Sequence, residues 1–223
     1  MIERFAIYEI DKLRDHFDLT VGVPKGVKQR YNIVPAQTIP VVLSKDGDIA
    51  MELMQWGFVP QNARDTSSIF RYKTFVVRSE DIFKKTMWEK SVRTQRCLVP
   101  ANGFYVWTQT PDGKIPHFIQ IVDQPLIALA GVYSSWTNSE GAAMGMVSIV
   151  TAPADYKSRP LTDRLPVVVQ TDQYASWLDP NVQDMASLYD VMRAPAHDAL
   201  QAVRVGDDIY SKKIDSPTLL REV

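Results

Sequence analysis

The sequence predicts an α+β fold: a single domain over residues 1–223, made of mostly antiparallel strands in barrel-like sheets with a few short helices. Short β-branched and aromatic runs recur along the chain, two pairs of them are joined by Asp-Gly turns, and stretches with helical periodicity are few and brief. A parallel doubly wound sheet would instead alternate strands with longer helices. Because mixed barrels of about this length are often single units, we expect one domain.

The stretch from Arg93 to Thr108 predicts two buried strands joined by a tight corner. An apolar run meets Pro100, the chain turns through 101–103, and an aromatic and β-branched run follows at 104–107. Proline cannot donate a hydrogen bond to a strand ladder, and Gly103 tolerates a positive φ. We therefore expect backbone chemistry to set this corner and to aim the side chains that follow it at a common site.

The first half of the chain predicts short strands, one clear hairpin and two short helices. Asp46-Gly47, between two β-rich runs, is a preferred sequence for a hairpin turn. Ser79 can cap a helix because its hydroxyl can accept a hydrogen bond from a backbone N–H of the first turn. The predicted elements are strands at 4–10, 38–44, 49–56 and 74–78, a helix with Leu13 and Phe17 on one face, a long surface loop at 57–72 that contains Arg64 and Arg71, and a helix after Ser79 with Phe83 and Met87 on one face.

The second half predicts another hairpin, four further strands and two short helices. Pro111-Asp112-Gly113 supplies the turn of the hairpin. The predicted elements are strands at 117–122, 126–136, 144–152 and 165–170, an irregular stretch at 153–164, a helix after Thr171 with Trp177 and Leu178, a helix with Val182, Met185, Tyr189 and Met192, and closing segments at 202–205 and 209–214.

The charge balance gives no sign of a nucleic-acid-binding protein. Lys+Arg 25 against Asp+Glu 26 gives a formal net charge of −1, so binding to nucleic acid would require a local basic face. No signal-peptide pattern begins the chain, and no apolar run approaches the ~20 residues that span a bilayer. We expect no membrane partner and a cytoplasmic location, nucleoid-associated if the protein is bacterial.

The residue types that usually hold metals or cofactors are sparse. Cys97 is the single cysteine, which excludes an internal disulfide and a multi-cysteine metal cluster, and its apolar surroundings predict a buried, inert thiol. The 3 histidines stand apart from one another and from other ligand residues, which argues against a zinc site. A phosphate-binding glycine loop and a G-x-S-x-G elbow are both absent from the sequence. We expect neither a metal nor a cofactor.

Separated motifs occur in order along essentially the whole chain. They are R-F-A at 4–6, Y-N-I-V-P at 31–35, M-Q-W-G-F-V-P at 54–60, R-S-E at 78–80, R-C-L-V-P-A-N-G-F-Y at 96–105 with Trp107, I-V-T at 149–151, D-R-L-P-V at 163–167 and S-K-K-I-D-S-P at 211–217. Together they resemble the SOS response-associated peptidase (SRAP) domain of abasic-site-processing proteins, which protect single-stranded DNA. The resemblance implies single-stranded DNA, with or without an abasic site, as the partner.

The resemblance also implies a covalent chemistry at defined positions. In that family a cysteine directly after the initiator methionine becomes the N-terminus, and its thiol and α-amine condense with the ring-opened aldehyde of an abasic site to form a thiazolidine. An asparagine two residues before the family's arginine, a glutamate in its F-Y-E-W-like strand and a histidine before its D-R pair assist positioning and proton transfer. The matching positions in this chain are Ile2, Val76, Val106 and Thr162.

None of these positions keeps the family's reactive group. Isoleucine cannot form a thiazolidine, and valine can neither accept a hydrogen bond nor transfer a proton. The bulk of Ile2 also disfavours enzymatic removal of Met1, and Glu3 replaces the small residue usual at that position. The chain therefore resembles a lyase-like and peptidase-like protein with no intact catalytic residue, and we expect neither crosslinking nor self-processing.

The positions that the resemblance assigns to DNA binding are retained. The planar fork of arginine suits phosphate, and tryptophan can stack on an unpaired base. An internal carboxylate is an equally good partner for an arginine, and burial is the alternative for the tryptophan. The expected DNA-binding residues are Arg4, Asn32, Arg78, Trp107, Thr151 and Arg164.

Three functions remain open from the sequence. The first is a monomeric family member that binds single-stranded or abasic-site DNA but has lost the covalent chemistry. The second is an altered form of an active abasic-site DNA–protein crosslinking protein. The third is a scaffold or interaction protein without a DNA role, which an acidic groove would favour; Glu3 is one acid already placed near its centre.

Overall fold

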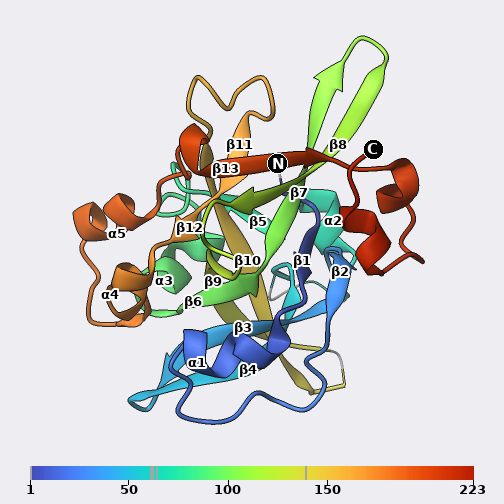
Figure 1. The fold of residues 1–223 in the computed structure, drawn as a ribbon. Coiled ribbons are helices and arrows are strands. Elements are labelled where there is room, and N and C mark those ends of the chain that lie inside the picture. Colours follow the sequence, from blue (N-terminus) through green and yellow to red (C-terminus); the bar gives the residue numbers. More distant parts are fainter. Residues whose placement is uncertain (1, 61–62, 64, 139) are drawn as a thin grey trace.

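A closed barrel of five strands is the centre of the computed structural model, which describes residues 2–60, 63, 65–138 and 140–223 (Figure 1). β10 pairs with both β4 and β9, and β3 and β6 complete the ring between them. Closure gives each of these strands a neighbour on both sides. The barrel strands are β3 (Thr38–Lys45), β4 (Asp48–Trp56), β6 (Arg96–Ala101), β9 (Ile127–Thr137) and β10 (Ala143–Pro153).

Three short strands extend the barrel by pairing with β9 or β10. β5 (Val76–Arg78) runs parallel to β10, β11 (Arg164–Pro166) runs antiparallel to it, and β12 (Val168–Val169) pairs with β9. The Val167 N–H donates to the Val150 carbonyl at 2.9 Å, whereas the Val167 carbonyl accepts from the Ala130 N–H at 2.9 Å. The single strand predicted at 165–170 is therefore split where the chain passes from β10 to β9.

A second sheet of five strands packs beside the barrel, in the order β13-β8-β7-β1-β2. Figure 1 shows that the far end of the β7–β8 hairpin projects beyond the barrel, next to the loop that follows β10. The strands of this sheet are β1 (Phe5–Ile7), β2 (Arg30–Ile33), β7 (Gly103–Thr110), β8 (Gly113–Ile121) and β13 (Leu200–Arg204).

The corner between β6 and β7 joins the barrel to the second sheet. Asn102 is fully buried there, and its side-chain oxygen accepts from the Tyr8 N–H at 2.6 Å and the Glu9 N–H at 3.1 Å. A Cβ on Gly103 would lie 2.4 Å from Phe118 Cζ and 2.6 Å from the Ile119 carbonyl oxygen. The predicted corner is confirmed, but Gly103 has no positive φ; the position requires glycine because β8 leaves no room for a side chain.

The helices are short and cover the outside of the barrel. The longest in the described ranges, α3, has 9 residues and packs against β6 and β9. None of the helices in those ranges is long and apolar enough to cross a bilayer. The helices are α1 (Leu13–His16), α2 (Ser68–Tyr72), α3 (Thr86–Thr94), α4 (Tyr174–Leu178) and α5 (Met185–Val191), with 3-10 turns at Ile10–Lys12, Thr171–Gln173, His197–Ala199, Asp207–Tyr210 and Pro217–Leu220.

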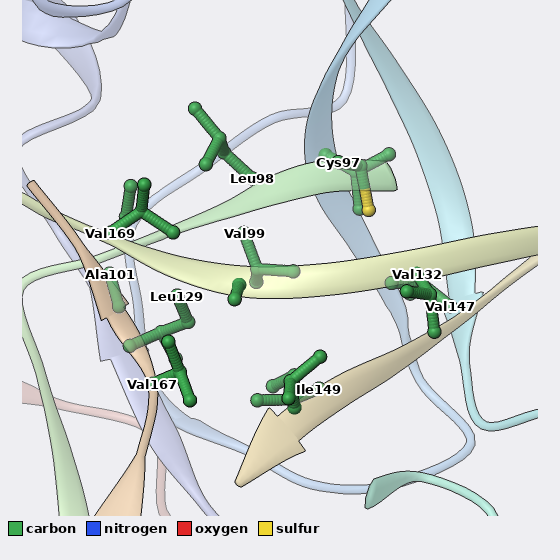
Figure 2. Close-up of a cluster of buried hydrophobic side chains, with 14 of the residues drawn as sticks. Cys97, Leu98, Val99, Ala101, Leu129, Val132, Val147, Ile149, Val167 and Val169 are labelled. Carbon is green, nitrogen blue, oxygen red and sulfur yellow. The ribbon is translucent and has the colours of Figure 1, made fainter. Parts of the chain in front are cut away.

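The barrel interior is filled by β-branched and aliphatic side chains, and Cys97 is one of its fully buried members. Figure 2 shows the thiol in a cluster that includes Val99, Val132 and Val147. Burial in this apolar setting raises the pKa of the Cys97 thiol far above its ordinary value, which disfavours the reactive thiolate. The prediction that Cys97 is buried is confirmed, and its raised pKa agrees with the expectation of an inert thiol.

The predicted fold class is confirmed: the structure is α+β, rich in mostly antiparallel strands, with a barrel and a few short helices. Two parallel pairings, β4–β10 and β5–β10, are the exceptions. Both predicted hairpins are present. At the first, Asp46 and Gly47 have φ angles of 53° and 90°, as a type I′ turn requires.

Two local predictions are wrong. Residues 79–85 form turns, and α3 begins only at Thr86. Ser79 does not cap a helix, because its N–H donates to the Thr151 carbonyl at 2.9 Å and keeps it beside β10. The predicted surface loop at 57–72 contains the helix α2, which is anchored by the fully buried Ile69. Arg64, predicted in that loop, lies outside the described residues.

Replacement of Gly103 by alanine should destabilise the fold by about 2–3 kcal/mol, because the added methyl group overlaps the Phe118 ring and the β8 backbone. Urea denaturation at equilibrium measures this loss. Gly22→Ala is the matched control, since no atom lies within 4 Å of a Cβ at Gly22. Equal stabilities for the two variants would contradict the assigned role of Gly103.

Candidate functional site

Three adjoining pockets share wall residues, and two of them are lined by the N-terminal segment. The Trp107 pocket, about 640 Å³, lies between the β7–β8 hairpin and the loop at 154–163. The Phe70 pocket, about 300 Å³, lies between α2 and the C-terminal segment. The Arg78 pocket, about 260 Å³, lies beside β5 and β11. Glu3 and Arg4 line the first two pockets, and Lys73 lines the second and third, so the three form one continuous surface.

Basic side chains dominate the walls of these pockets. Eight basic residues and three acidic residues line them, although the whole chain has a net charge of −1. This is the local basic face that nucleic-acid binding would require, and we use that name for the walls of the three pockets. Six of its basic residues form no ion pair with a described residue: Arg4, Lys73, Arg78, Lys114, Arg159 and Lys212.

Arg4 is held at the centre of the basic face by neutral oxygen atoms. The Tyr105 N–H donates to the Arg4 carbonyl at 2.9 Å, which ties this residue to β7. The guanidinium donates to Asn32 Oδ1 at 2.6 Å and to the Tyr210 carbonyl at 3.3 Å. Burial lowers the pKa of Arg4 and the nearby Glu3 raises it, but an arginine in a protein remains charged. Arg4 is thus an oriented positive charge without a carboxylate partner among the described residues.

Asn32 is a buried residue that orients the guanidinium of Arg4. It is 3% exposed, and its amide nitrogen donates to the Ser211 and Ile214 carbonyls, both at 2.9 Å. Its backbone N–H donates to the Asp215 carboxylate at 3.0 Å. Because these bonds and the bond to Arg4 occupy the side chain, the structure places Asn32 under the basic face and ties β2 to the C-terminal segment.

Arg164 has an internal carboxylate partner. Its guanidinium forms two parallel hydrogen bonds with Glu80, at 2.8 and 2.7 Å, and donates to the Thr151 carbonyl at 2.8 Å. This pairing lowers the pKa of Glu80 from 4.5 to about 2. Thr151 is 1% exposed, and its hydroxyl donates to the Val77 carbonyl at 3.2 Å. Of the two partners open to Arg164 from the sequence, the carboxylate is the one that the structure contains.

Arg78 and Trp107 both face the pockets. Arg78 is exposed at the end of β5, and its side chain forms no hydrogen bond or ion pair with a described residue. The ring of Trp107 is half-buried on the wall of its pocket, and its centroid lies 6.3 Å from that of Tyr210. The structure thus presents a free guanidinium and part of an indole on the same basic face.

The four positions that the resemblance matches to the family's reactive residues lie on or beside this same surface. Two of them, Thr162 and Val76, line the Trp107 pocket and the Arg78 pocket. The other two, Ile2 and Val106, are fully buried, and each directly precedes a wall residue. The Thr162 hydroxyl donates to the Arg164 carbonyl at 3.2 Å. Met1 lies outside the described residues.

Sequence reasoning missed several residues of the basic face, among them Phe70, Lys73 and Lys212. A signal was available, because aromatic and basic residues alternate from Phe70 to Lys73, at the end of the surface loop predicted at 57–72. Lys212 belongs to the C-terminal motif, and only the fold brings its ammonium group over the Phe70 ring, 5.7 Å from the ring centroid. Within the described residues, no three His, Cys, Asp or Glu side chains gather in a metal-binding group.

Replacement of Glu80 by glutamine should lower the free energy of unfolding by about 1 kcal/mol at pH 7, because the pair with Arg164 is partly exposed and screened by water. The folded-state pKa of Glu80, about 2, is below its ordinary value of 4.5. The stabilisation is therefore fully present above about pH 4.5 and is lost as the pH falls towards 2. Urea denaturation should show a smaller difference between parent and variant at pH 3 than at pH 7.

The matched control is Glu222→Gln, because Glu222 is exposed and forms no ion pair with a described residue. A difference between parent and Glu80→Gln that does not change with pH would show that the ion pair contributes nothing to stability.

Comparison with known proteins supports the resemblance seen in the motifs. The family model described as SOS response associated peptidase (SRAP) matches residues 1–212. The chain is 28% identical over 223 residues to the abasic site processing protein YoqW of Bacillus subtilis, covering 99% of each chain. It is 29% identical to YoaM of the same organism, covering 99% of this chain and 97% of the relative.

The fold also occurs in solved structures. A crystal structure of a Bacteroides thetaiotaomicron protein superimposes with a TM-score of 0.88 at 20% identity, covering 99% of both chains. A Bordetella bronchiseptica protein gives a TM-score of 0.74 at 17% identity, covering 92% of this chain and 100% of that chain. These structures show the shared fold, and the family model shows the relationship: this chain belongs to the SOS response associated peptidase (SRAP) family.

Proposed function

We propose that this protein binds single-stranded DNA, including DNA with an abasic site, on the basic face and without forming a covalent bond. The observation that carries the proposal is the pair of guanidinium groups, Arg4 and Arg78, that face the pockets without a carboxylate partner among the described residues. The Bacillus relatives that match the full chain are named abasic site processing proteins, which supports DNA as the ligand.

The arrangement of charge fits a phosphate backbone better than an isolated anion. Unpaired basic residues occur in all three connected pockets, so positive charge extends along the surface. Arginine can donate two hydrogen bonds to one phosphate, and release of counterions from the nucleic acid adds affinity at low salt. Glu3 is exposed where the Trp107 and Phe70 pockets meet, so its carboxylate opposes part of this attraction.

The loss of covalent chemistry follows from the residues near this surface. A thiazolidine requires a thiol and an amine on one residue, whereas the Ile2 side chain is apolar and fully buried. Val106 is also fully buried and offers no group that can accept or donate a proton. Thr162 keeps a hydroxyl on the wall of the Trp107 pocket. A threonine hydroxyl, unlike an imidazole, does not gain or lose a charge near neutral pH, so it is a poor substitute as a general acid or base.

Arg78→Ala should weaken binding to single-stranded DNA about tenfold at low salt and should reduce the slope of log K against log [salt] by about 1. The physical reason is the loss of one phosphate contact from an exposed guanidinium. Fluorescence anisotropy with a labelled oligonucleotide at several salt concentrations measures both quantities. Arg14→Ala is the control, because Arg14 is also exposed and lies on α1, away from the three pockets.

If Arg78→Ala and Arg14→Ala change the affinity for single-stranded DNA equally, the basic face is not the binding site. If the parent protein does not bind single-stranded DNA even at low salt, the proposal fails and a scaffold without a DNA role is favoured.

The parent protein should form no adduct with an abasic oligonucleotide that survives boiling, because Ile2 supplies no thiol. A denaturing gel checks this outcome, and mass spectrometry of the intact protein shows whether Met1 is retained. A boiling-resistant band would contradict the inactivity. The combined replacement of Ile2→Cys, Glu3→Gly, Val76→Asn, Val106→Glu and Thr162→His should produce the band if these positions match the family's reactive residues. Circular dichroism of that variant confirms that it is folded.

A further inference from the structure

The short helix α2 turns two aromatic side chains towards solvent. Phe70 is 50% exposed and Tyr72 is 62% exposed, whereas Ile69, which directly precedes Phe70, is fully buried. Ile69 occupies the space where a Cβ of Gly57 would lie, with its Cγ2 atom 2.4 Å from that position. The helix is therefore anchored through one face, and its exposed aromatic rings are presented on a fixed support.

Cationic groups lie directly beside these rings. The Lys212 ammonium lies 5.7 Å from the centroid of the Phe70 ring. Lys73 ends α2 in the left-handed conformation, with a φ of 50°, and its side chain lines both the Phe70 pocket and the Arg78 pocket. Neither lysine has a carboxylate partner among the described residues. Exposed aromatic faces flanked by unpaired cations are the combination that binds single-stranded nucleic acids.

The positive charges beside Phe70 and Tyr72 favour a nucleic acid strand over an apolar protein segment as the ligand. An apolar protein segment placed on Phe70 and Tyr72 would leave the ammonium groups of Lys73 and Lys212 without counter-charges at its border, at a cost in solvation. A single strand of nucleic acid presents an aromatic base and a phosphate with every nucleotide, so it satisfies rings and cations together. Arg4, on the wall of the same pocket, continues the positive charge towards the Trp107 pocket.

We propose that Phe70 in its pocket and Tyr72 in the adjoining Arg78 pocket form a stacking platform of two separate rings for unpaired bases of a single strand whose phosphates contact Lys73 and Lys212. The platform lies on one side of Glu3 and Arg4, and Trp107 with Tyr210 lies on the other, since Glu3 and Arg4 line both pockets. The bound strand therefore passes over the N-terminal segment with an aromatic contact at each side. This inference rests on the proposed binding of single-stranded DNA and specifies where the bases lie.

The test uses the intact protein and oligonucleotides that carry 2-aminopurine at successive positions, because the fluorescence of this base is quenched on stacking. The parent protein should quench the probe at one or two positions. Phe70→Ala should abolish that quenching and weaken binding at least fivefold, without changing the salt slope, since no charge is removed. Phe70→Tyr keeps the ring and should retain quenching, while Phe70→Leu keeps only the apolar bulk and should not.

Tyr156→Ala is the matched control, because Tyr156 is 76% exposed and lines none of the three pockets. Melting temperatures of all variants should stay near that of the parent, because the replaced rings are largely exposed. Retained quenching and unchanged affinity in Phe70→Ala, with the parent still binding, would overturn the platform while leaving the proposed function intact. If the parent does not bind, both proposals are overturned.

Discussion

The corner at Asn102 and Gly103 is the constraint on which the arrangement of the molecule depends, because it carries the chain from the barrel into the second sheet. Gly103 leaves no space for a side chain against β8, and the buried Asn102 amide bonds to the backbone after β1. The Asn102 N–H also donates to the Ala6 carbonyl at 2.8 Å, and two residues beyond Gly103 the Tyr105 N–H donates to the Arg4 carbonyl. The position of the N-terminal segment, and so of Glu3 and Arg4 between two pockets, follows from this corner.

The arginines of the basic face show that the role of an arginine depends on the neighbours that the fold gives it, and not on the composition of the chain. Arg164 and Arg78 lie on the wall of one pocket, yet only Arg164 meets a carboxylate, that of Glu80. Arg4 is half-buried and is held by an amide and a carbonyl oxygen, with no carboxylate partner among the described residues. A chain whose net charge is −1 can in this way present a continuous positive surface. Glu3 contributes a negative charge within that surface.

The apolar residues at positions 2 and 106 are consistent with the burial around them. Ile2 and Val106 are fully buried, and a carboxylate at position 106 would have to be desolvated there. An unpaired polar group in such a place costs about 1–3 kcal/mol, so an apolar replacement is expected to stabilise the fold. Arg78 carries no such penalty, because it is exposed and its charge stays in contact with water.

The sequence by itself determined the β-rich class, both hairpins and the buried cysteine, because Asp-Gly turns and alternating apolar runs act over a few residues. It also placed the family's motifs, since residue identities in order need no coordinates. Only the tertiary structure decided that Ser79 bonds to Thr151 instead of capping a helix, and that Glu80 pairs with Arg164, 84 positions away. The same holds for Phe70, whose ring meets Lys212 only in the folded chain. These contacts join segments that lie far apart in the sequence. Their energy arises only when folding brings the segments together, so no local sequence pattern encodes them.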